Sequence, residues 1–308
     1  MFQNLILENC SEEKGFIKSD HKKERRIQVM FAKTEWIKIL TECRNNVQKK
    51  IEPLLRTINK PQPDLGLGAG GDPTRKIDVT AENAIVDVLK KSKITFTLIS
   101  EESGIVEYGE SPRSCYVTVD PIDGTTNLIR GIPFYATSIA VSKKPSLKTV
   151  HAGLVADLVH GTTYTALRGR GAYRDNGRIT PSQETSIEKG VIGVDLNSYR
   201  IRQLAPRLTA LMSQAEHIRH FGANALELCY VAEGIIDAFV DIRGKLRTTD
   251  VAAASLILAE AGGILTTPEG QPLDVKLDPK QKVEFIAAAN AKIYDRIFSL
   301  VKAQKEQR

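Results

Sequence analysis

The stretch Cys115–Tyr135 reads C-Y-V-T-V-D-P-I-D-G-T-T-N-L-I-R-G-I-P-F-Y, and the rest of the chain can be interpreted around it. Its first residues alternate apolar side chains, which predicts a buried strand that ends on Asp120. Pro121 has no N–H to give to a neighbouring strand, so sheet pairing is expected to stop there.

The turn that follows this strand gathers groups that suit a hard cation and a phosphate. Asp123 comes three residues after Asp120, and Gly124 permits a sharp bend. Thr125 and Thr126 can then cap a short helix. Carboxylates on a strand-end turn bind divalent cations, and a helix start binds anions. The simpler alternative is an Asx-turn, in which both carboxylates bond only backbone N–H groups.

Length and composition predict a large core. The chain has 308 residues, 42% of them hydrophobic, which is enough for two subdomains. The formal net charge is +6, and much of the excess lies in residues 21–26 and 302–308. We interpret these runs as solvated tails, since no aromatic residues interleave with the charges as nucleic-acid binding would require. Association with RNA is kept as an alternative.

Cysteine usage and hydropathy predict a cytoplasmic protein. Cys10, Cys43, Cys115 and Cys229 are widely spaced and form no C-x-x-C pair, which favours free thiols over a zinc site or a disulfide framework. No apolar run approaches the roughly 20 residues of a membrane-spanning helix. The N-terminal residues also lack the layout of a signal peptide.

Helices and strands are predicted to mix without strict alternation, which favours an α+β fold. Residues 1–29 lack clear periodicity and are interpreted either as an N-terminal extension or as the result of a start codon placed too early. A subdomain boundary is expected near residue 145, between subdomains over 30–145 and 146–308. The apolar spacing predicts helices over residues 34–58, 202–213 and 291–306, with Thr34 as a cap, and strands over 94–100, 136–142, 151–157, 162–167, 191–196, 235–240, 264–266 and 283–289.

Other carboxylates lie next to predicted strand and helix ends. Glu101 and Glu102 follow a strand and point to opposite sides, so only one of them can face a given cation. Asp78 precedes a helix and Asp250 lies at a helix start, and each has the simpler interpretation of a helix cap. The Gly-rich loop 60–71 lacks the G-K-[ST] of a Walker site and is expected to be a mobile flap.

Three ordered segments resemble the inositol monophosphatase family of lithium-sensitive, Mg²⁺-dependent phosphatases. D-P-I-D-G-T-T-N resembles the central metal-binding motif, S-E-E-S-G resembles the G-E-E-S segment, and T-D-V-A-A-A resembles the W-D-x-A-A-G element, with Thr249 in place of tryptophan. That replacement, the D-x-R-x-x-x-R run from Asp241 to Arg247 and the spacing of Asp72 and Asp78 resemble archaeal members. The resemblance covers about residues 34–305 and implies a layered α-β-α-β-α sandwich of the sugar phosphatase type.

The resemblance also implies the metal site. A first Mg²⁺ would be held by Glu101, Asp120 and the carbonyl of Ile122, and a second by Asp120, Asp123 and Asp250. A third ion would lie near Glu101 and Glu102. Mn²⁺ is expected to substitute for Mg²⁺, and Li⁺ to inhibit. The residues implied for catalysis are Asp78, Thr125, Glu101 and Asp250, with Asp78 and Thr125 orienting the attacking water.

Substrate contacts are implied in the same way. The substrate would be a small phosphorylated molecule, with no membrane or nucleic acid as partner. R-H-F-G-A-N resembles the R-S-x-G segment of the family, whose helix start faces the substrate. Salt bridges are the simpler role for the charged members of this set. The implied contacts are Asp123, Gly124, Thr125, Ser198, Arg219, Gly222, Ala223, Asp241, Arg243 and Lys245.

The expected activity is hydrolysis of sugar phosphates, namely fructose 1,6-bisphosphate or inositol 1-phosphate, by a homodimer. One alternative is a 3′-phosphoadenosine 5′-phosphate nucleotidase, although those enzymes usually read D-G-T-K-G after the Asp pair. The other is a catalytically inactive regulatory homologue, which would normally have lost a ligand carboxylate.

Overall fold

The structure is a computed structural model that describes residues 35–58, 65–196 and 201–306. The predicted extension over residues 1–29, the predicted cap Thr34, Cys10 and the substrate candidate Ser198 lie outside these ranges. Cys43, Cys115 and Cys229 are free thiols. No helix of the described ranges is long and apolar enough to cross a membrane.

The first described helix covers residues 35–55. The elements that follow it are α2 (Lys76–Lys91), β1 (Phe96–Ser100), β2 (Gly104–Tyr108), β3 (Tyr116–Asp123), α3 (Thr125–Arg130), β4 (Ala136–Ser142), β5 (Val150–Asp157), β6 (Thr163–Leu167), β7 (Ala172–Arg174), β8 (Gly177–Arg178), β9 (Val191–Val194), α4 (Ile201–Gln214), β10 (His217–Arg219), α5 (Asn224–Glu233), β11 (Ala238–Arg247), α6 (Thr248–Ala261), β12 (Ile264–Thr266), β13 (Lys282–Ala288) and α7 (Ala291–Glu306).

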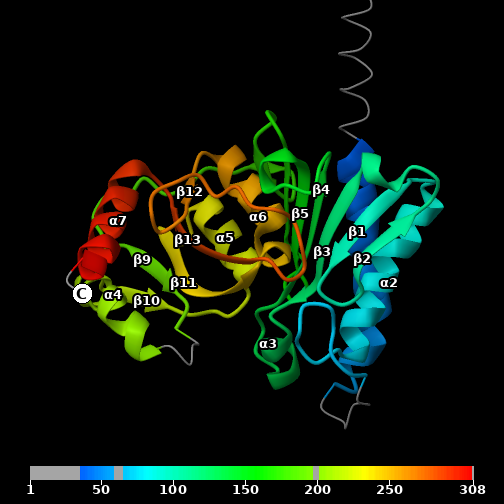
Figure 1. The fold of residues 1–308 in the computed structure, drawn as a ribbon, viewed down its shortest axis with the longest axis horizontal. Helices are drawn as coiled ribbons and strands as arrows, with labels where there is room; N and C mark the ends of the chain where they lie inside the picture. The colour runs from blue at the N-terminus through cyan, green and yellow to red at the C-terminus, as the bar shows by residue number, and fades with distance from the viewer. Residues whose placement is uncertain (1–34, 59–64, 197–200, 307–308) are drawn as a thin grey trace, which may run out of the picture.

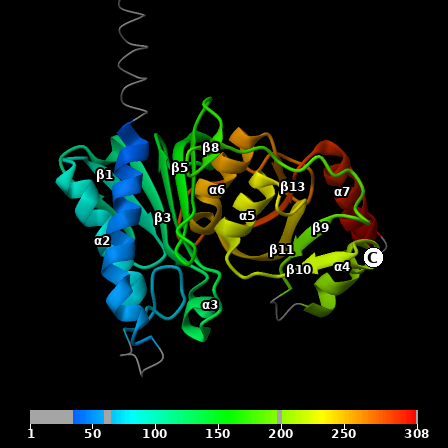
Figure 2. The ribbon, with the colours of Figure 1, turned by 180° about the vertical axis from the view of Figure 1, so that it is seen from behind.

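These elements form five layers, seen in Figure 1 and from behind in Figure 2. The helix over residues 35–55 and α2 cover one face of an eight-stranded sheet. Helices α5 and α6 lie between that sheet and a five-stranded sheet. Helices α4 and α7 cover the outer face of the second sheet. The predicted α-β-α-β-α sandwich is therefore confirmed.

Each contact between layers has its own apolar core. The strands β1, β3, β4 and β5 of the first sheet are buried on both faces: in β4, Ile139 packs toward α2 and Ala140 toward α6. Helix α6 lies close to β5 because residue 153 of that strand is a glycine: a Cβ at Gly153 would lie 3.1 Å from the carbonyl oxygen of Ala253 in α6. This close approach brings the start of α6 to the strand ends that carry the predicted site.

The two sheets differ in their connections. The first has the order β2-β1-β3-β4-β5-β6-β7-β8, with β1 and β3 parallel and the other pairs antiparallel. The second has the order β10-β9-β11-β13-β12. The first sheet continues across residue 145 to Arg178, so the boundary expected there divides one sheet. Residues 179–190 connect the two sheets, and the division into subdomains stays a prediction.

The prediction that β3 ends at Asp120 is wrong. The strand continues through Pro121 to Asp123, since a bulge between Asp120 and Asp123 takes one residue out of register with β4. The proline is tolerated at this irregularity because no regular ladder bond is required of it. The cap of α3 is Gly124 rather than a threonine, with φ of 88°.

Helix starts were also displaced from their predicted positions. Helix α2 begins at Lys76, so Asp78 lies inside its first turn and not before the helix, and α5 begins at Asn224. Strand β11 does not end at Asp241 but continues, with a bulge, to Arg247. Helix α6 starts directly after it, which makes Asp250 its third residue and not its cap.

Candidate active site

Three carboxylates meet where β1, β3 and α6 approach one another. Ser100 of β1 pairs with Val119 of β3 in parallel, so the next residues, Glu101 and Asp120, lie side by side. Asp250 enters from the first turn of α6. One oxygen from each of the three carboxylates lies within 4.8 Å of the others. We call Glu101, Asp120 and Asp250 the carboxylate cluster.

Burial and mutual repulsion make this cluster hold protons tightly. Burial, and then the charge of Asp250, raise the pKa of Glu101 to about 8. Burial, followed by the charges of Glu101, Asp123 and Asp250, raises the pKa of Asp120 well above its ordinary value. The pKa of Asp250 is also raised, mainly by burial. Three ionised carboxylates at this spacing need a cation to compensate them.

The cluster suits a hard divalent cation. Its donors are all carboxylate oxygens, which are the ligands that Mg²⁺ prefers. Within the described residues, the buried Oδ1 of Asp120 has no hydrogen-bond partner. A buried carboxylate oxygen without a partner is costly, and a bound cation would satisfy it. The residues present therefore fit the metal that the sequence predicts.

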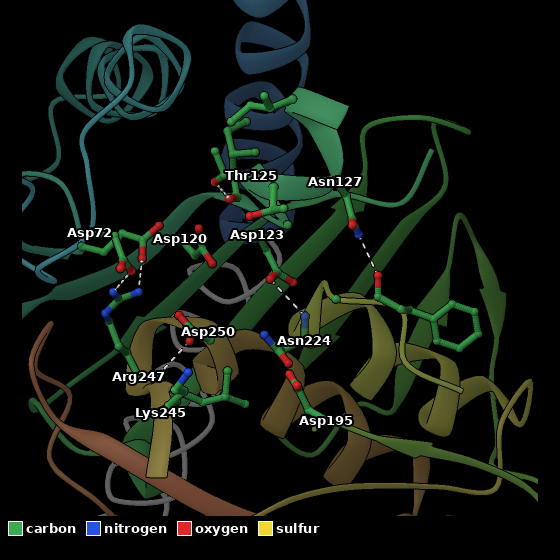
Figure 3. Close-up of a pocket in the computed structure, with 18 of the residues that line it drawn as sticks. Asp72, Asp120, Asp123, Thr125, Asn127, Asp195, Asn224, Lys245, Arg247 and Asp250 are labelled. Atoms are coloured by element: carbon green, nitrogen blue, oxygen red, sulfur yellow. Dashed lines mark hydrogen bonds and ion pairs between the residues drawn. The ribbon is translucent and has the colours of Figure 1, made fainter. Parts of the chain in front are cut away.

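Asp123 has a different position from the cluster. Its two oxygens accept hydrogen bonds from the backbone N–H groups of Asn224 (3.0 Å) and Ala225 (2.7 Å), at the start of α5 (Figure 3). Burial, and then Asp250, raise its pKa to about 7. Asp123 thus joins the first sheet to the helix layer, and its role as a metal ligand stays a prediction.

The turn after β3 is shaped for close contact with α5. A Cβ at Gly124 would lie 3.0 Å from both the Ala223 Cβ and the Phe134 carbonyl oxygen, and the residue has positive φ, so only glycine fits. Asn127 of α3 reinforces the contact by donating to the carbonyl oxygens of Phe134 (2.8 Å) and Phe221 (2.7 Å).

The predicted pair of Thr125 and Asp78 is present. Thr125 Oγ1 lies 3.5 Å from Asp78 Oδ1 and donates more closely to the Ile122 carbonyl oxygen, at 2.9 Å. Burial, and then the charge of Glu102, raise the pKa of Asp78 to about 7. The carbonyl of Ile122 keeps a second lone pair and can still serve as a ligand.

The two adjacent glutamates diverge as predicted. Glu101 joins the cluster, whereas Glu102 accepts a hydrogen bond from Thr74 Oγ1 at 2.8 Å. The described part of the loop before α2 is fastened to both, since Ala69 N–H donates to the Glu102 carbonyl (3.0 Å) and Gly70 N–H to the Glu101 carbonyl (2.7 Å). The loop therefore forms one wall of the site.

These groups line one cavity of about 970 Å³, shown in Figure 3. Both acidic and basic side chains line it. Its acidic residues are Asp72, Glu101, Glu102, Asp120, Asp123, Asp195 and Asp250. Its basic residues are Arg75, Arg243, Lys245, Arg247 and Lys282. Gly124, Thr125 and Gly222 line it as predicted, and Ala223 is buried at the start of α5.

Ala223 and two further predicted substrate residues, Arg219 and Asp241, do not line the cavity. Arg219 is exposed and donates to the carbonyl of its neighbour Ile218 at 2.9 Å. Asp241 is fully buried and accepts bonds from Arg243 Nε at 3.1 and 3.0 Å. Arg243 also pairs with Asp195. We therefore expect its guanidinium to hold Asp195 and Asp241 in place rather than to bind a phosphate.

Sequence reasoning missed several residues of the cavity. Asp195 follows the buried strand β9 as Glu101 follows β1, so the same pattern of a carboxylate after a strand could have identified it. Arg247 was noticed only as part of a motif. Asn224 and Lys282 carry no local signal, since their places depend on how α5 and β13 pack.

The comparisons with known proteins agree with this geometry. A sequence model described as the inositol monophosphatase family matches residues 33–306. The chain therefore belongs to the inositol monophosphatase family, and it is a phosphoric monoester hydrolase of this metal-dependent class.

Three individual proteins are similar to most of this chain. A protein of Methanothermobacter thermautotrophicus named fructose-1,6-bisphosphatase/inositol-1-monophosphatase is 35% identical over 271 residues, covering 85% of this chain and 95% of that protein. A solved inositol monophosphatase–fructose 1,6-bisphosphatase superposes with a TM-score of 0.76 at 30% identity, covering 86% and 99% of the two chains. A bifunctional NADP phosphatase/NAD kinase of Methanococcus maripaludis is 31% identical over 79% of this chain but 45% of that protein.

Proposed function

We propose that the protein is a Mg²⁺-dependent phosphatase that hydrolyses fructose 1,6-bisphosphate and inositol 1-phosphate. The observation that carries the proposal is the carboxylate cluster, which lies beside the Gly124–Thr125 turn in a cavity that basic side chains also line. The names of the archaeal relatives support the choice of these two substrates.

We propose that Glu101, Asp120 and the Ile122 carbonyl hold one Mg²⁺, and that Asp120, Asp123 and Asp250 hold a second. Glu102 would help to hold a third. When bound, the ions would make water a better nucleophile and compensate charge on the phosphate and the leaving oxygen. Mn²⁺ is expected to support activity and Li⁺ to inhibit it.

The protein groups would orient the reactants. We propose that ionised Asp78 accepts a hydrogen bond from Thr125 Oγ1 at Oδ1, in place of the Ile122 carbonyl, which leaves the hydroxyl oxygen free to accept a hydrogen bond from the attacking water. The N–H groups of Gly124 and Thr125 would bind phosphate oxygens. Water adds to phosphorus as the P–O ester bond breaks, so the products are inorganic phosphate and the sugar alcohol.

We propose Lys245 as the contact for the second phosphate of a bisphosphate, because it lines the cavity and Arg219 does not. The expected result for Lys245→Met is a KM for fructose 1,6-bisphosphate at least tenfold higher, with the KM for inositol 1-phosphate within twofold. Arg219→Met is the matched variant and is expected to change neither.

The test is phosphate release from four substrates in parallel, with Mg²⁺ present: fructose 1,6-bisphosphate, inositol 1-phosphate, NADP and 3′-phosphoadenosine 5′-phosphate. We expect the two sugar phosphates to have the highest kcat/KM. A preference for NADP would place the enzyme with the Methanococcus relative, and a preference for the last substrate would make it a nucleotidase. Equal effects of Lys245→Met on both sugar phosphates would remove the second-phosphate assignment.

From its resemblance to the family, we also propose that the protein is a cytoplasmic homodimer. Light scattering of the purified protein is expected to give twice the chain mass of 34.0 kDa. A mass of one chain would contradict this part without affecting the catalytic assignment.

A further inference from the structure

Arg247 places a permanent positive charge against the carboxylate cluster (Figure 3). Its side chain is 10% exposed, and its Nη1 donates to Glu101 Oε2 at 2.7 Å. Its backbone N–H donates to Asp250 Oδ2 at 2.9 Å, in the capping arrangement that starts α6. One residue therefore contacts two of the three carboxylates that are expected to bind metal.

The same guanidinium holds the loop that precedes α2. Its Nε donates to the carbonyl oxygen of Gly70 at 3.2 Å, and its Nη2 pairs with Asp72, whose side chain is 74% exposed. A Cβ at position 70 would lie 2.8 Å from Arg247 Nε, so the contact requires glycine. Because each guanidinium nitrogen has a partner, the loop, Arg247 and the cluster form one connected unit.

The charge of Arg247 has opposite effects in the two states of the site. Arginine stays protonated in proteins, so the charge is always present. Without metal it offsets the repulsion between Glu101 and its neighbours. With a divalent cation in the cluster, the same charge repels the cation and holds an oxygen of Glu101 that the cation would otherwise use.

We propose that Arg247 is a positioning residue that lowers the affinity of the cluster for Mg²⁺ and couples metal binding to the loop over residues 65–74. The inference rests on the proposed metal site. Metal binding is weaker because the guanidinium of Arg247 stabilises both the metal-free cluster and the loop.

The test is calorimetric titration of Mg²⁺ into EDTA-treated, dialysed protein, with no substrate present. Arg247→Gln is expected to bind Mg²⁺ about tenfold more tightly than the wild type and to melt at a lower temperature in EDTA. Asp72→Asn is expected to change affinity in the other direction, binding two- to fivefold more weakly, because it removes a negative charge and leaves the guanidinium to Glu101.

Hydrogen exchange gives a second readout. The amides of Ala69 and Gly70, which donate to the carbonyls of Glu102 and Glu101, are expected to exchange faster in both variants. The matched control is Arg113→Gln, which breaks a remote ion pair with Glu107 at 2.7 Å, where Arg113 is 78% exposed. It is expected to leave Mg²⁺ affinity and loop exchange unchanged.

Opposite signs in Arg247→Gln and Asp72→Asn would support the inference, because a purely structural role would weaken binding in both. Weaker binding in Arg247→Gln would overturn it. If Arg247→Gln does not fold, Arg247→Lys takes its place, because lysine keeps the charge but cannot make the contacts of all three guanidinium nitrogens. An affinity within threefold of the wild type, together with faster loop exchange, would support the inference. Tighter binding would contradict it. A wild-type protein that binds no Mg²⁺ would instead refute the metal site itself.

Discussion

Replacing Asp120 with asparagine should make the metal-free protein more stable while abolishing its response to metal. Asp120 is 3% exposed, and its neighbours Glu101, Asp123 and Asp250 all repel its charge. Asparagine has nearly the same shape and no charge, so the substitution removes repulsion without creating a cavity. The same change removes a central ligand of the proposed metal site.

The size of the effect follows from the spacing in the cluster. Two full charges at 4.8 Å, the outer limit of the cluster, repel by about 3.5 kcal/mol at an effective dielectric constant of about 20. At pH 8.5 the unfolded chain ionises Asp120, whereas the folded protein must either keep Asp120 protonated or bear this repulsion, so its removal is expected to gain about 2–3 kcal/mol there. For a chain of this length that corresponds to a rise in Tm of roughly 3–5 °C.

The sign of the pH dependence can be stated in advance. The folded protein binds protons more tightly than the unfolded chain, since the pKa values of Glu101, Asp123 and Asp78 are raised to about 8, 7 and 7. Stability in EDTA should therefore fall from about pH 4, where these groups ionise in the unfolded chain, to pH 7–8, where they ionise in the folded protein. Asp120→Asn should lessen this fall.

Calorimetric melts at pH 5.5 and 8.5, with EDTA and with Mg²⁺, test the reasoning. The wild type should gain about 2.7 kcal/mol at 100 times the Mg²⁺ dissociation constant, and Asp120→Asn should gain nothing. The reasoning is refuted if the variant in EDTA melts below the wild type at pH 8.5. Asp237→Asn, a buried carboxylate that accepts the Val191 N–H at 2.8 Å outside the site, is the matched control and should lose stability at both pH values.

Three further predictions concern other parts of the chain. Asp123→Asn should abolish turnover and leave the protein folded, as circular dichroism and phosphate release would show; retained turnover would remove Asp123 from the metal set. Glu260→Gln should cost about 1–3 kcal/mol in urea unfolding, since its carboxylate accepts the N–H groups of Gly169, Arg170 and Gly171 at 2.7–3.1 Å, and kcat should stay within twofold; unchanged unfolding would contradict this. Deleting residues 1–29 should leave kcat/KM nearly unchanged, and a large loss would make the extension part of the enzyme.

Strongly patterned segments were predictable because local signals and packing agree in them. The apolar segment over residues 136–142 was predicted as a strand, and β4 has these bounds. The cluster followed from motifs and from strand ends, since parallel pairing of β1 and β3 aligns the residues that follow them. The strand and the cluster depend on contacts between residues that are close in sequence, or on the pairing of two strands.

Features that depend on distant contacts were not predictable. The bulge at Pro121 is set by pairing with β4, and the continuation of β11 past Asp241 is set by its pairing with β13. The separation of Arg219 from the cavity, and the burial of Asp241 against Arg243, depend on how the second sheet packs. A sequence pattern can suggest a charged residue for a site but not the direction of its side chain.

The most direct test of the central claim is phosphate release from fructose 1,6-bisphosphate during a Mg²⁺ titration, with EDTA as the starting condition. Wild-type protein and Asp120→Asn are measured side by side. The account predicts release only from the wild type and only with Mg²⁺, half-maximal near the dissociation constant found by calorimetry. Release in EDTA, or equal release from Asp120→Asn, would contradict the assignment of the carboxylate cluster as the metal-dependent centre.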